Sequence, residues 1–433
     1  EIDDALSVQG LGSGTVTLGI HIAAPGLAMA PDDALDQIAR QRLSTVYMPG
    51  HKITMLPDTV VQTYTLEAGR ACPAVSLYLK IDETSLAVLE SRTALERVPI
   101  VSNLRHDRLD GVITAGWLAG ESTVTEAPAE VQALRPTLGF LYRLALQLKA
   151  QRELVRGKPE TFTRPDYSFR LEGVQGGQPN GSETVHIGTR RRGEPLDLMV
   201  AEAMILANST WGQWLADCGV PGIYRSQASL APGVKVRMGT KAQPHAGIGV
   251  RCYAWSTSPL RRYVDLVNQW QIIACARFGK TAALVAPFKP KDASLFSIVS
   301  AFDAAYSAYN VFQNGMERFW TLRYLQQEHI GELTATLVRD NLVRADMLPL
   351  VLPVLGAEGL PRGAHVRVRL GEVDEMALEV SGTVTERLDL PADVQEEDSG
   401  DEAGEDDALV TPLHLAIEVD EAPADGPTPS ASA

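Results

Sequence analysis

Two arginines follow a helix-start signal in the stretch Thr257-Ser258-Pro259-Leu260-Arg261-Arg262-Tyr263-Val264-Asp265-Leu266. Ser258 suits the N-cap of a helix and Pro259 its first position, so both arginines are expected in a first helical turn. Cations there oppose the helix dipole, yet a helix N-terminus reinforced by guanidinium groups makes a strong anion site. The stretch therefore indicates a phosphate site; an exposed pair of salt-bridging side chains is the alternative.

Carboxylates are concentrated in a second stretch, Glu1-Ile2-Asp3-Asp4-Ala5-Leu6-Ser7. In an extended strand Glu1 and Asp3 point to one face and Asp4 to the other, whereas a turn would let all three converge. Such a site would suit Mg²⁺, which prefers oxygen ligands. An acidic fringe in solvent is the alternative. Enzymes that cleave phosphodiesters commonly combine a divalent metal with an arginine.

The bulk composition is that of an ordinary globular protein, with 45% hydrophobic and 21% charged residues among 433. A chain of this length predicts two domains. The four cysteines show no metal-ligand spacing, which favours a reducing compartment, and we expect a cytoplasmic protein. No apolar run is long enough to cross a membrane. The chain starts inside the acidic motif without a Met, so we expect further sequence upstream.

The net charge of −15 argues against a nucleic-acid partner until its distribution is considered. From Glu386 to the end, 15 acidic residues accompany one basic residue, a net charge of −14. Subtracting −14 from −15 leaves about −1 for the rest of the chain, which holds basic runs such as Arg190-Arg191-Arg192. Electrostatic contacts are screened beyond roughly 10 Å, so this body allows a local basic channel.

Hydrophobic periodicity predicts strands over 15–22, 74–81 and 85–88, and helices over 31–43, 129–155, 196–216 and about 295–328. After His329, short alternating segments at 332–338, 365–370 and 376–384 predict a small β-barrel. The acidic run 395–407 is expected to be disordered, with a late strand over 412–420. The predicted class is α+β, with a large mixed domain over 1–329, an all-β barrel over 330–388 and an acidic tail over 389–433.

Together these stretches resemble the ribonuclease II family, whose catalytic domain is shared by ribonuclease II, ribonuclease R and the eukaryotic exosome nuclease. The matching motifs run in order over roughly the first 325 residues, and several collinear motifs of this kind are highly specific. They comprise 1–7, Gly19-Ile20-His21-Ile22-Ala23, Val46-Tyr47-Met48-Pro49-Gly50, Met55-Leu56-Pro57, Arg164-Pro165-Asp166-Tyr167, 201–208, Gly222-Ile223-Tyr224-Arg225 and 257–266.

This resemblance implies an RNB-type catalytic domain followed by an OB-fold RNA-binding module. It also implies a processive 3′→5′ exoribonuclease that degrades single-stranded RNA to nucleoside 5′-monophosphates with Mg²⁺, for which Mn²⁺ would substitute. Asp3 and Asp4 match two of the family's four metal-site aspartates, and Glu1 stands where a third is usual. Arg261 matches the arginine that contacts the scissile phosphate. Glu317 matches a glutamate near the terminal nucleotide, and with Asp4 and Arg261 it completes the expected catalytic set.

The resemblance also implies a set of RNA-binding residues. Tyr47 matches the aromatic residue that packs against the 3′-terminal nucleotides, and His106 stands where the family has a second aromatic residue, a tyrosine. Glu202 is the remaining member of a pair of glutamates whose other position is alanine here. Arg262 and Tyr263, which follow Arg261, are expected to join them.

Two other functional classes stay open from the sequence. Three residues depart from the family pattern: Glu1, His106 and Ala201. They are compatible with a catalytically weakened relative that only binds RNA, although intact Asp3, Asp4 and Arg261 favour an enzyme. A phosphodiesterase acting on DNA or a small nucleotide would use the same metal chemistry. The barrel and the base-stacking candidates favour a long polymer instead. We expect a monomer whose partner is single-stranded RNA, with no membrane association.

Overall fold

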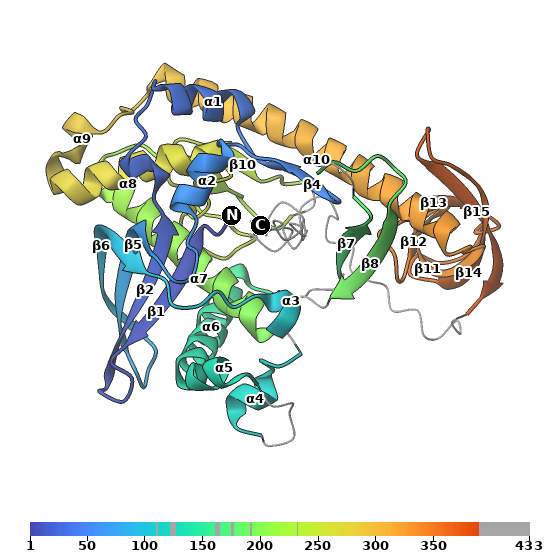
Figure 1. Ribbon diagram of the computed structural model, residues 1–433, viewed down its shortest axis with the longest axis horizontal. Coiled ribbons are helices and arrows are strands. Elements are labelled where there is room, and N and C mark those ends of the chain that lie inside the picture. The colour runs from blue at the N-terminus through green and yellow to red at the C-terminus, as the bar shows by residue number, and fades with distance from the viewer. Residues whose placement is uncertain are drawn as a thin grey trace, which may run out of the picture.

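An antiparallel sheet of four strands, in the order β1-β2-β5-β6, lies along one side of the molecule (Figure 1). The strands are β1 (Asp4–Gln9), β2 (Thr15–Ala23), β5 (Ala71–Asp82) and β6 (Val88–Pro99). The computed structural model describes residues 1–109, 111–121, 127–160, 165–174, 177–190, 193–231 and 233–388. In these residues the mixture of helices, a sheet and a barrel confirms the predicted α+β class.

The main core forms because alternate residues of β2 and β5 are apolar and point to one face of the sheet. From β2, Val16, Leu18, Ile20 and Ile22 are all buried there. Two long helices pack against this face, α6 (Arg135–Arg156) and α7 (Pro195–Asp217), and contribute to the same hydrophobic cluster. The strand predicted over 15–22 and the helix predicted over 196–216 are confirmed.

A central helix, α8 (Tyr263–Phe278), is buried along its whole length as far as Cys275. It packs between the main core and a second apolar cluster, to which α1 (Ala34–Arg42) contributes Leu35 and Ala39. Because α8 is buried on every side, its start lies in the protein interior. The segment just before α8 is the phosphate-site candidate of the sequence.

The remaining elements are short. The ribbons are β3 (Val46–Met48) with β4 (His51–Ile53), β7 (Asp166–Glu172) with β8 (Thr184–Arg190), and β9 (Tyr224–Ser226) with β10 (Arg237–Gly239). The helices are α2 (Asp58–Tyr64), α3 (His106–Leu109), α4 (Ala115–Ala119), α5 (Ala129–Ala133) and α9 (Ala282–Val285), with 3₁₀ turns at Pro25–Leu27 and Gly279–Thr281.

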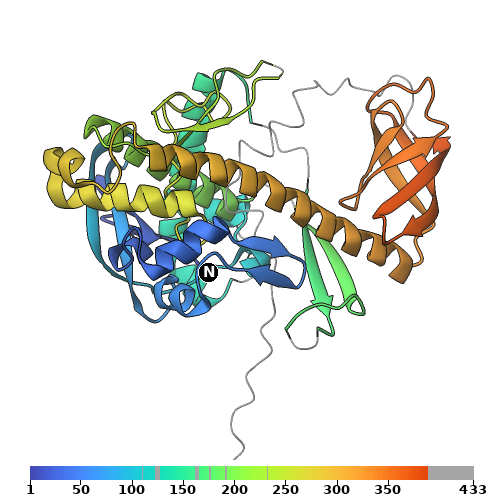
Figure 2. The same ribbon diagram turned by 90° about the horizontal axis from the view of Figure 1, so that it is seen from above.

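One 35-residue helix, α10 (Ala293–Gln327), runs from the body to a barrel, as Figure 2 shows from above. The barrel is closed, in the order β11-β12-β13-β15-β14, with parallel pairing only between β13 and β15. Its strands are β11 (Glu332–Arg339), β12 (Leu342–Ala345), β13 (Val351–Leu355), β14 (His365–Asp374) and β15 (Glu379–Arg387). Leu322 and Leu325 of α10 enter the barrel core, so helix and barrel share one hydrophobic cluster.

Several predicted boundaries are wrong for identifiable reasons. The helix expected over 129–155 is divided at Leu134 into α5 and α6, because Pro136 belongs in a first helical turn. The strand expected from 85 begins at Val88, since Leu86 adopts a positive φ of 57° within a turn. Met376–Leu378 likewise form a turn before β15. The predictions for 395–407 and 412–420 lie outside the described residues.

None of the helices in the described ranges is sufficiently long and apolar to span a membrane.

Candidate active site

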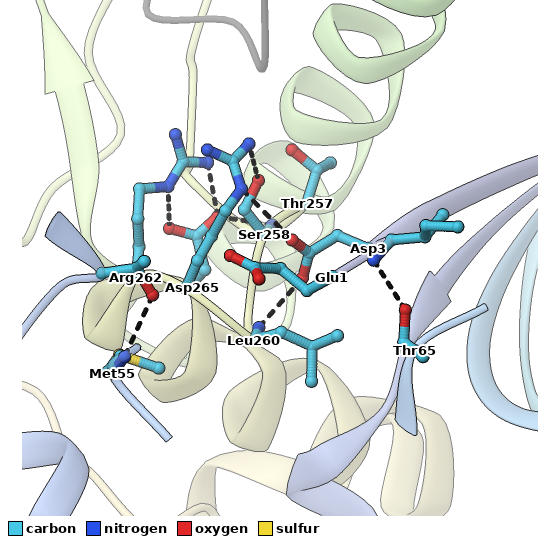
Figure 3. A network of polar contacts seen from close by, with 12 residues as sticks. Glu1, Asp3, Met55, Thr65, Thr257, Ser258, Leu260, Arg262 and Asp265 are labelled. Atoms are coloured by element: carbon cyan, nitrogen blue, oxygen red, sulfur yellow. Dashed lines mark hydrogen bonds and ion pairs between the residues drawn. The ribbon is translucent and has the colours of Figure 1, made fainter. Parts of the chain in front are cut away.

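The two stretches singled out in the sequence lie against each other in the fold. Asp3, directly before β1, accepts a hydrogen bond from the backbone N–H of Leu260 at 2.9 Å, through Oδ1. Its Oδ2 pairs with Nε of Arg261 at 3.2 Å. Figure 3 shows Glu1 and Asp3 beside the segment that holds Ser258 and Leu260. The fold thus joins a carboxylate and a guanidinium that are 258 positions apart in the chain.

The arginines do not lie in a first helical turn, which corrects the expectation from Ser258-Pro259. Residues 259–261 form a turn closed by the N–H groups of Arg261 and Arg262 on the Ser258 carbonyl, and α8 begins only at Tyr263. The reason is Asp265, whose carboxylate accepts from the Ser258 N–H at 2.9 Å and from Arg262 at two atoms. Its hydrogen bonds to Ser258 and Arg262 keep residues 259–261 out of helical geometry.

The same turn is attached to the chain that leads into β3. The N–H of Thr45 donates to the Arg261 carbonyl at 2.8 Å, and the N–H of Tyr263 donates to the Leu43 carbonyl at 2.8 Å. An isolated bridge pairs Ser44 with Arg262. Tyr47 therefore follows only two residues after a fixed contact with the Arg261 backbone.

Tyr47 on β3 is hydrogen-bonded to two other parts of the protein. Its hydroxyl donates to the Glu1 carboxylate, which also pairs with Lys52 Nζ on β4 at 2.9 Å. Its backbone N–H donates to Oε1 of Gln313 on α10 at 2.8 Å. Tyr47 thus connects the acidic opening, the β3–β4 hairpin and the long helix.

Burial controls the electrostatics of the two aspartates. Burial raises the pKa of Asp3 to about 7, although the Arg261 guanidinium and the Leu260 N–H favour the ionised form. Burial likewise raises the pKa of Asp4 to about 6, against the opposing effect of Arg261. Two carboxylates of raised pKa beside a single guanidinium form a site in which additional positive charge would be stabilising.

The three predicted metal ligands fit a divalent cation unequally. Asp4 fits best, because its carboxylate has no hydrogen-bond donor among the described residues. Asp3 supplies a second oxygen donor but already accepts from Leu260 and Arg261. Both oxygens of Glu1 are engaged by Tyr47 and Lys52. In the described part of the chain, no group of three or more His, Cys, Asp or Glu side chains is arranged to hold a metal.

Glu317 is the third residue of the expected catalytic set, and it lies on α10. One helical turn separates it from Gln313, so both residues share a face of the helix, and Gln313 contacts Tyr47. Burial alone raises the pKa of Glu317 to about 7. The helix thereby places a carboxyl group that ionises near neutral pH on the side of α10 that meets β3.

Three residues expected to bind RNA are instead buried in specific polar contacts. Arg262 is paired with Asp265 at 2.7 and 2.8 Å and lies 4.1 Å over the Trp255 ring. Tyr263 donates its hydroxyl to Asp36 at 2.6 Å. Glu202 forms a buried ion pair with Arg152. Each is below 4% exposed, so direct contact with RNA stays a prediction that this conformation does not favour.

His106 is the first residue of α3, and its side chain lies outside what the structure describes. Sequence reasoning missed Lys52 and Gln313. The signal for Lys52 was present, because Pro49-Gly50 predicts a tight turn and a hairpin that sets residue 52 opposite Tyr47. Gln313 gave no local signal, since its contact with Tyr47 spans 266 positions.

The comparison with protein families gives one clear match. The sequence pattern of the RNB domain matches residues 1–236 and 230–277, more than half of the chain. An uncharacterized ribonuclease from Synechocystis is 28% identical over 416 residues, covering 90% of this chain and 56% of the relative. Exoribonuclease 2 of Vibrio parahaemolyticus is 24% identical over 320 residues, covering 62% and 45%. The chain spans about half the length of the curated relatives it matches.

Solved structures share the fold. A Dss1 exoribonuclease active-site mutant from Candida glabrata superposes with a TM-score of 0.70 at 19% identity, covering 88% of this chain and 53% of that one. RNase R of Mycoplasma genitalium, in complex with ribose-methylated single-stranded RNA, gives 0.68 at 14% identity, covering 88% and 69%. Yeast Ssd1, described as a pseudonuclease, gives 0.55 at 15% identity, covering 79% and 46%.

Proposed function

Because the chain belongs to the RNB domain family, we propose that it is a 3′→5′ exoribonuclease which hydrolyses single-stranded RNA to nucleoside 5′-monophosphates with Mg²⁺. The observation that carries the proposal is the meeting of Asp3 and Asp4 with Arg261 across the length of the chain. Relatives of this chain are named exoribonucleases, and RNase R, of the same fold, was solved with RNA. The barrel after α10 is proposed as the OB-type module that grips the RNA further from its end.

Asp4 would be the main ligand of the Mg²⁺ ion, and Asp3 would add an oxygen that it shares with Leu260 or Arg261. A bound Mg²⁺ supplies Lewis-acid stabilisation of the charge that develops on the phosphate and activates the attacking water. Arg261 contributes a guanidinium whose Nη1 has no hydrogen-bond partner among the described residues, while Nε and Nη2 are fixed by Asp3 and Ser258. A guanidinium held this rigidly is preorganised to stabilise a phosphoryl oxygen without reorientation.

The partly buried Tyr47 ring is proposed to stack on the 3′-terminal base, because every base has a π-face and stacking tolerates any sequence. Glu317, on the helix face that meets β3, is proposed to hydrogen-bond to the terminal nucleotide. Contacts to the 2′-hydroxyl would then select RNA over DNA.

The test uses RNA labelled at its 5′ end and DNA of the same sequence, each incubated with the intact protein in Mg²⁺ or in EDTA. The proposal expects a ladder that shortens from the 3′ end of RNA only, with Mg²⁺ only. Cleavage of the DNA to the same extent, or cleavage in EDTA, would contradict it.

A catalytically weakened RNA-binding relative is the second candidate. Two observations favour it. Both oxygens of Glu1 are bonded to Tyr47 and Lys52 and not directed to a metal, and the fold is shared with the pseudonuclease Ssd1. In the same assay this candidate expects tight binding of the RNA with no shortening in Mg²⁺.

A further inference from the structure

The β3–β4 hairpin presents two side chains to one carboxylate. Tyr47 lies directly opposite Lys52 in the antiparallel register, so both side chains project from the same face of the hairpin. On that face Glu1 Oε1 accepts from the Tyr47 hydroxyl and Oε2 pairs with Lys52 Nζ at 2.9 Å. The Glu1 side chain is 3% exposed, against 35% for Lys52. This contact is a built, buried junction rather than a chance surface pair.

These contacts leave Glu1 poorly suited to bind a divalent cation. A metal ion at Oε2 would lie beside the Lys52 ammonium, and like charges at such a distance repel strongly in a partly buried site. At Oε1 it would compete with a charge-assisted hydrogen bond from the phenol. Asp4 has neither obstacle.

The junction instead fixes an aromatic ring at both ends. The backbone of Tyr47 is held to Gln313 on α10, and its hydroxyl is held to Glu1. A ring with both ends fixed loses little conformational freedom when a base stacks on it, which favours binding. A glutamate side chain is one methylene longer than an aspartate side chain, and this length lets the Glu1 carboxylate reach the phenol.

We propose that Glu1 is a positioning residue that holds the Tyr47 ring for the RNA terminus through the Glu1–Tyr47–Lys52 junction, and that it is not a metal ligand. This inference rests on the proposed function, in which Tyr47 stacks on the terminal nucleotide. It assigns this chain's departure from the family pattern to RNA binding.

The test compares Glu1→Met, which removes the carboxylate that accepts the hydrogen bond, with Tyr47→Phe, which keeps the ring but cannot donate one. The double variant, Glu1→Asp, and the isosteric Glu1→Gln in case Glu1→Met fails to fold complete the set. Glu90→Gln is the control, because Glu90 is an exposed residue in a loose ion pair with Lys80. Two quantities are measured on the intact protein: the Kd for single-stranded RNA in EDTA, which blocks hydrolysis, and the Kd for Mn²⁺ by EPR without RNA.

We expect Glu1→Met and Tyr47→Phe each to raise the RNA Kd by about threefold to tenfold, the scale of ordering one side chain on binding. The double variant should be no weaker than either single variant, because both remove the same contact. Glu1→Asp should behave like Glu1→Met, since its carboxylate falls short of the phenol. The Mn²⁺ Kd should stay unchanged in all of them, as in Glu90→Gln.

Two outcomes would overturn the proposal. One is a Mn²⁺ Kd that rises about tenfold in Glu1→Met or Glu1→Gln but not in Tyr47→Phe, or that improves in Glu1→Asp, because a ligand would behave so. The other is an additive loss of RNA affinity in the double variant. A wild-type protein that binds no RNA would refute the proposed function instead, and the Mn²⁺ comparison would still decide whether Glu1 is a ligand.

Discussion

At the scale of single residues, Asp4 is the less compensated of the two aspartates of the site. It lacks a hydrogen-bond donor among the described residues, and only Arg261 favours its charged form. We expect Asp4→Asn to abolish RNA hydrolysis while RNA binding persists, because the change removes a metal ligand and a repulsive negative charge together. Single-turnover cleavage and RNA affinity measured on the same preparation check this. An equal loss of binding and cleavage would contradict the assignment.

Arg261 differs from its neighbour Arg262 in the hydrogen bonds that its guanidinium makes. Its Nη1 has no partner in the described part of the chain, whereas Arg262 is clamped by Asp265. We expect Arg261→Ala to lower the cleavage rate by about two orders of magnitude, the scale of losing one preorganised donor to an oxyanion. The rate is measured at saturating RNA. A rate within a few-fold of wild type would rule out the role.

The protonation state of Glu317 makes the free energy of unfolding depend on pH. Burial raises its pKa from 4.5 to about 7, so the unfolded chain releases this proton first. Its contribution to stability is complete below about pH 4.5 and is lost as pH rises through 7. We expect Glu317→Gln to be more stable than wild type by on the order of 2–3 kcal/mol at about pH 8, and equal to it near pH 4.5. Denaturant unfolding at both pH values checks this, and a gain that persists in acid would contradict it.

The composition of the candidate site was partly predictable from sequence. Glu1, Asp3, Arg261 and Tyr47 were chosen from motifs, and the fold gathers them around one turn. The buried states of Tyr263 and Glu202 were not predictable, because their partners Asp36 and Arg152 are distant in sequence. Arg262 pairs with Asp265 only three positions away, so for this residue the sequence hid the burial and not the partner. Local sequence shows a charged or polar side chain but not which partner will bury it.

At the scale of elements, the turn before α8 depends on one buried ion pair. The Arg262 and Asp265 side chains are 4% and 0% exposed, and Asp265 also fixes the Ser258 N–H. We expect Asp265→Ala to destabilise the protein by about 3–5 kcal/mol, because it leaves an uncompensated buried guanidinium. Replacing both partners, as in Arg262→Met with Asp265→Leu, should cost less.

Thermal and denaturant unfolding of the intact protein measure these changes. Glu67→Ala is the matched control, since the Glu67–Arg70 pair is largely exposed and should contribute less than about 1 kcal/mol. An Asp265→Ala variant as stable as this control would show that the turn is held by other contacts.

Most regular elements could be predicted because their apolar residues repeat at the helical or strand period. This holds for β2, α1, α7 and α10, each found within a few residues of its expected bounds. The predicted start of α8 was wrong because capping patterns are local, while the bridge from Ser44 to Arg262 and the hydrogen bond from the Thr45 N–H to Arg261 restrain this turn from a distant part of the chain. Tertiary contacts of that kind leave no periodic signal.

At the scale of the whole molecule, charge is divided between the body and the last residues. Residues 389–433 carry 14 acidic and no Lys or Arg residues, so nearly all of the net charge of −15 lies there. We expect removal of 389–433 to strengthen RNA binding by about threefold or more at low salt, because a like-charged segment no longer repels the phosphates. The effect should fade as salt rises, since screening shortens the range of the interaction.

Titration of both proteins with labelled RNA over a series of salt concentrations checks this. An affinity that is identical at every salt concentration, or a difference that grows with salt, would contradict the electrostatic explanation.

The general architecture followed from sequence, but its assembly did not. A small barrel after His329 was expected from short alternating segments, and a closed barrel is present. The parallel contact between β13 and β15 that closes it joins Val354 to Gly382, and no local pattern encodes such a pairing. Packing of Leu322 and Leu325 into that barrel is likewise a property of the assembled fold.

Because α10 is one continuous helix, its length and rotation fix where the barrel lies relative to the site. Glu317 lies on the site side of this helix and Leu325 inside the barrel, a separation of about 12 Å along the axis at 1.5 Å per residue. Each residue inserted between them would turn the barrel by about 100° around that axis, whereas about seven residues would restore its phase and move it by roughly 10 Å. In the proposed function, where both the barrel and the site bind RNA, the register of this one helix would set the direction and distance from which the RNA arrives, and hence the shortest RNA that contacts both.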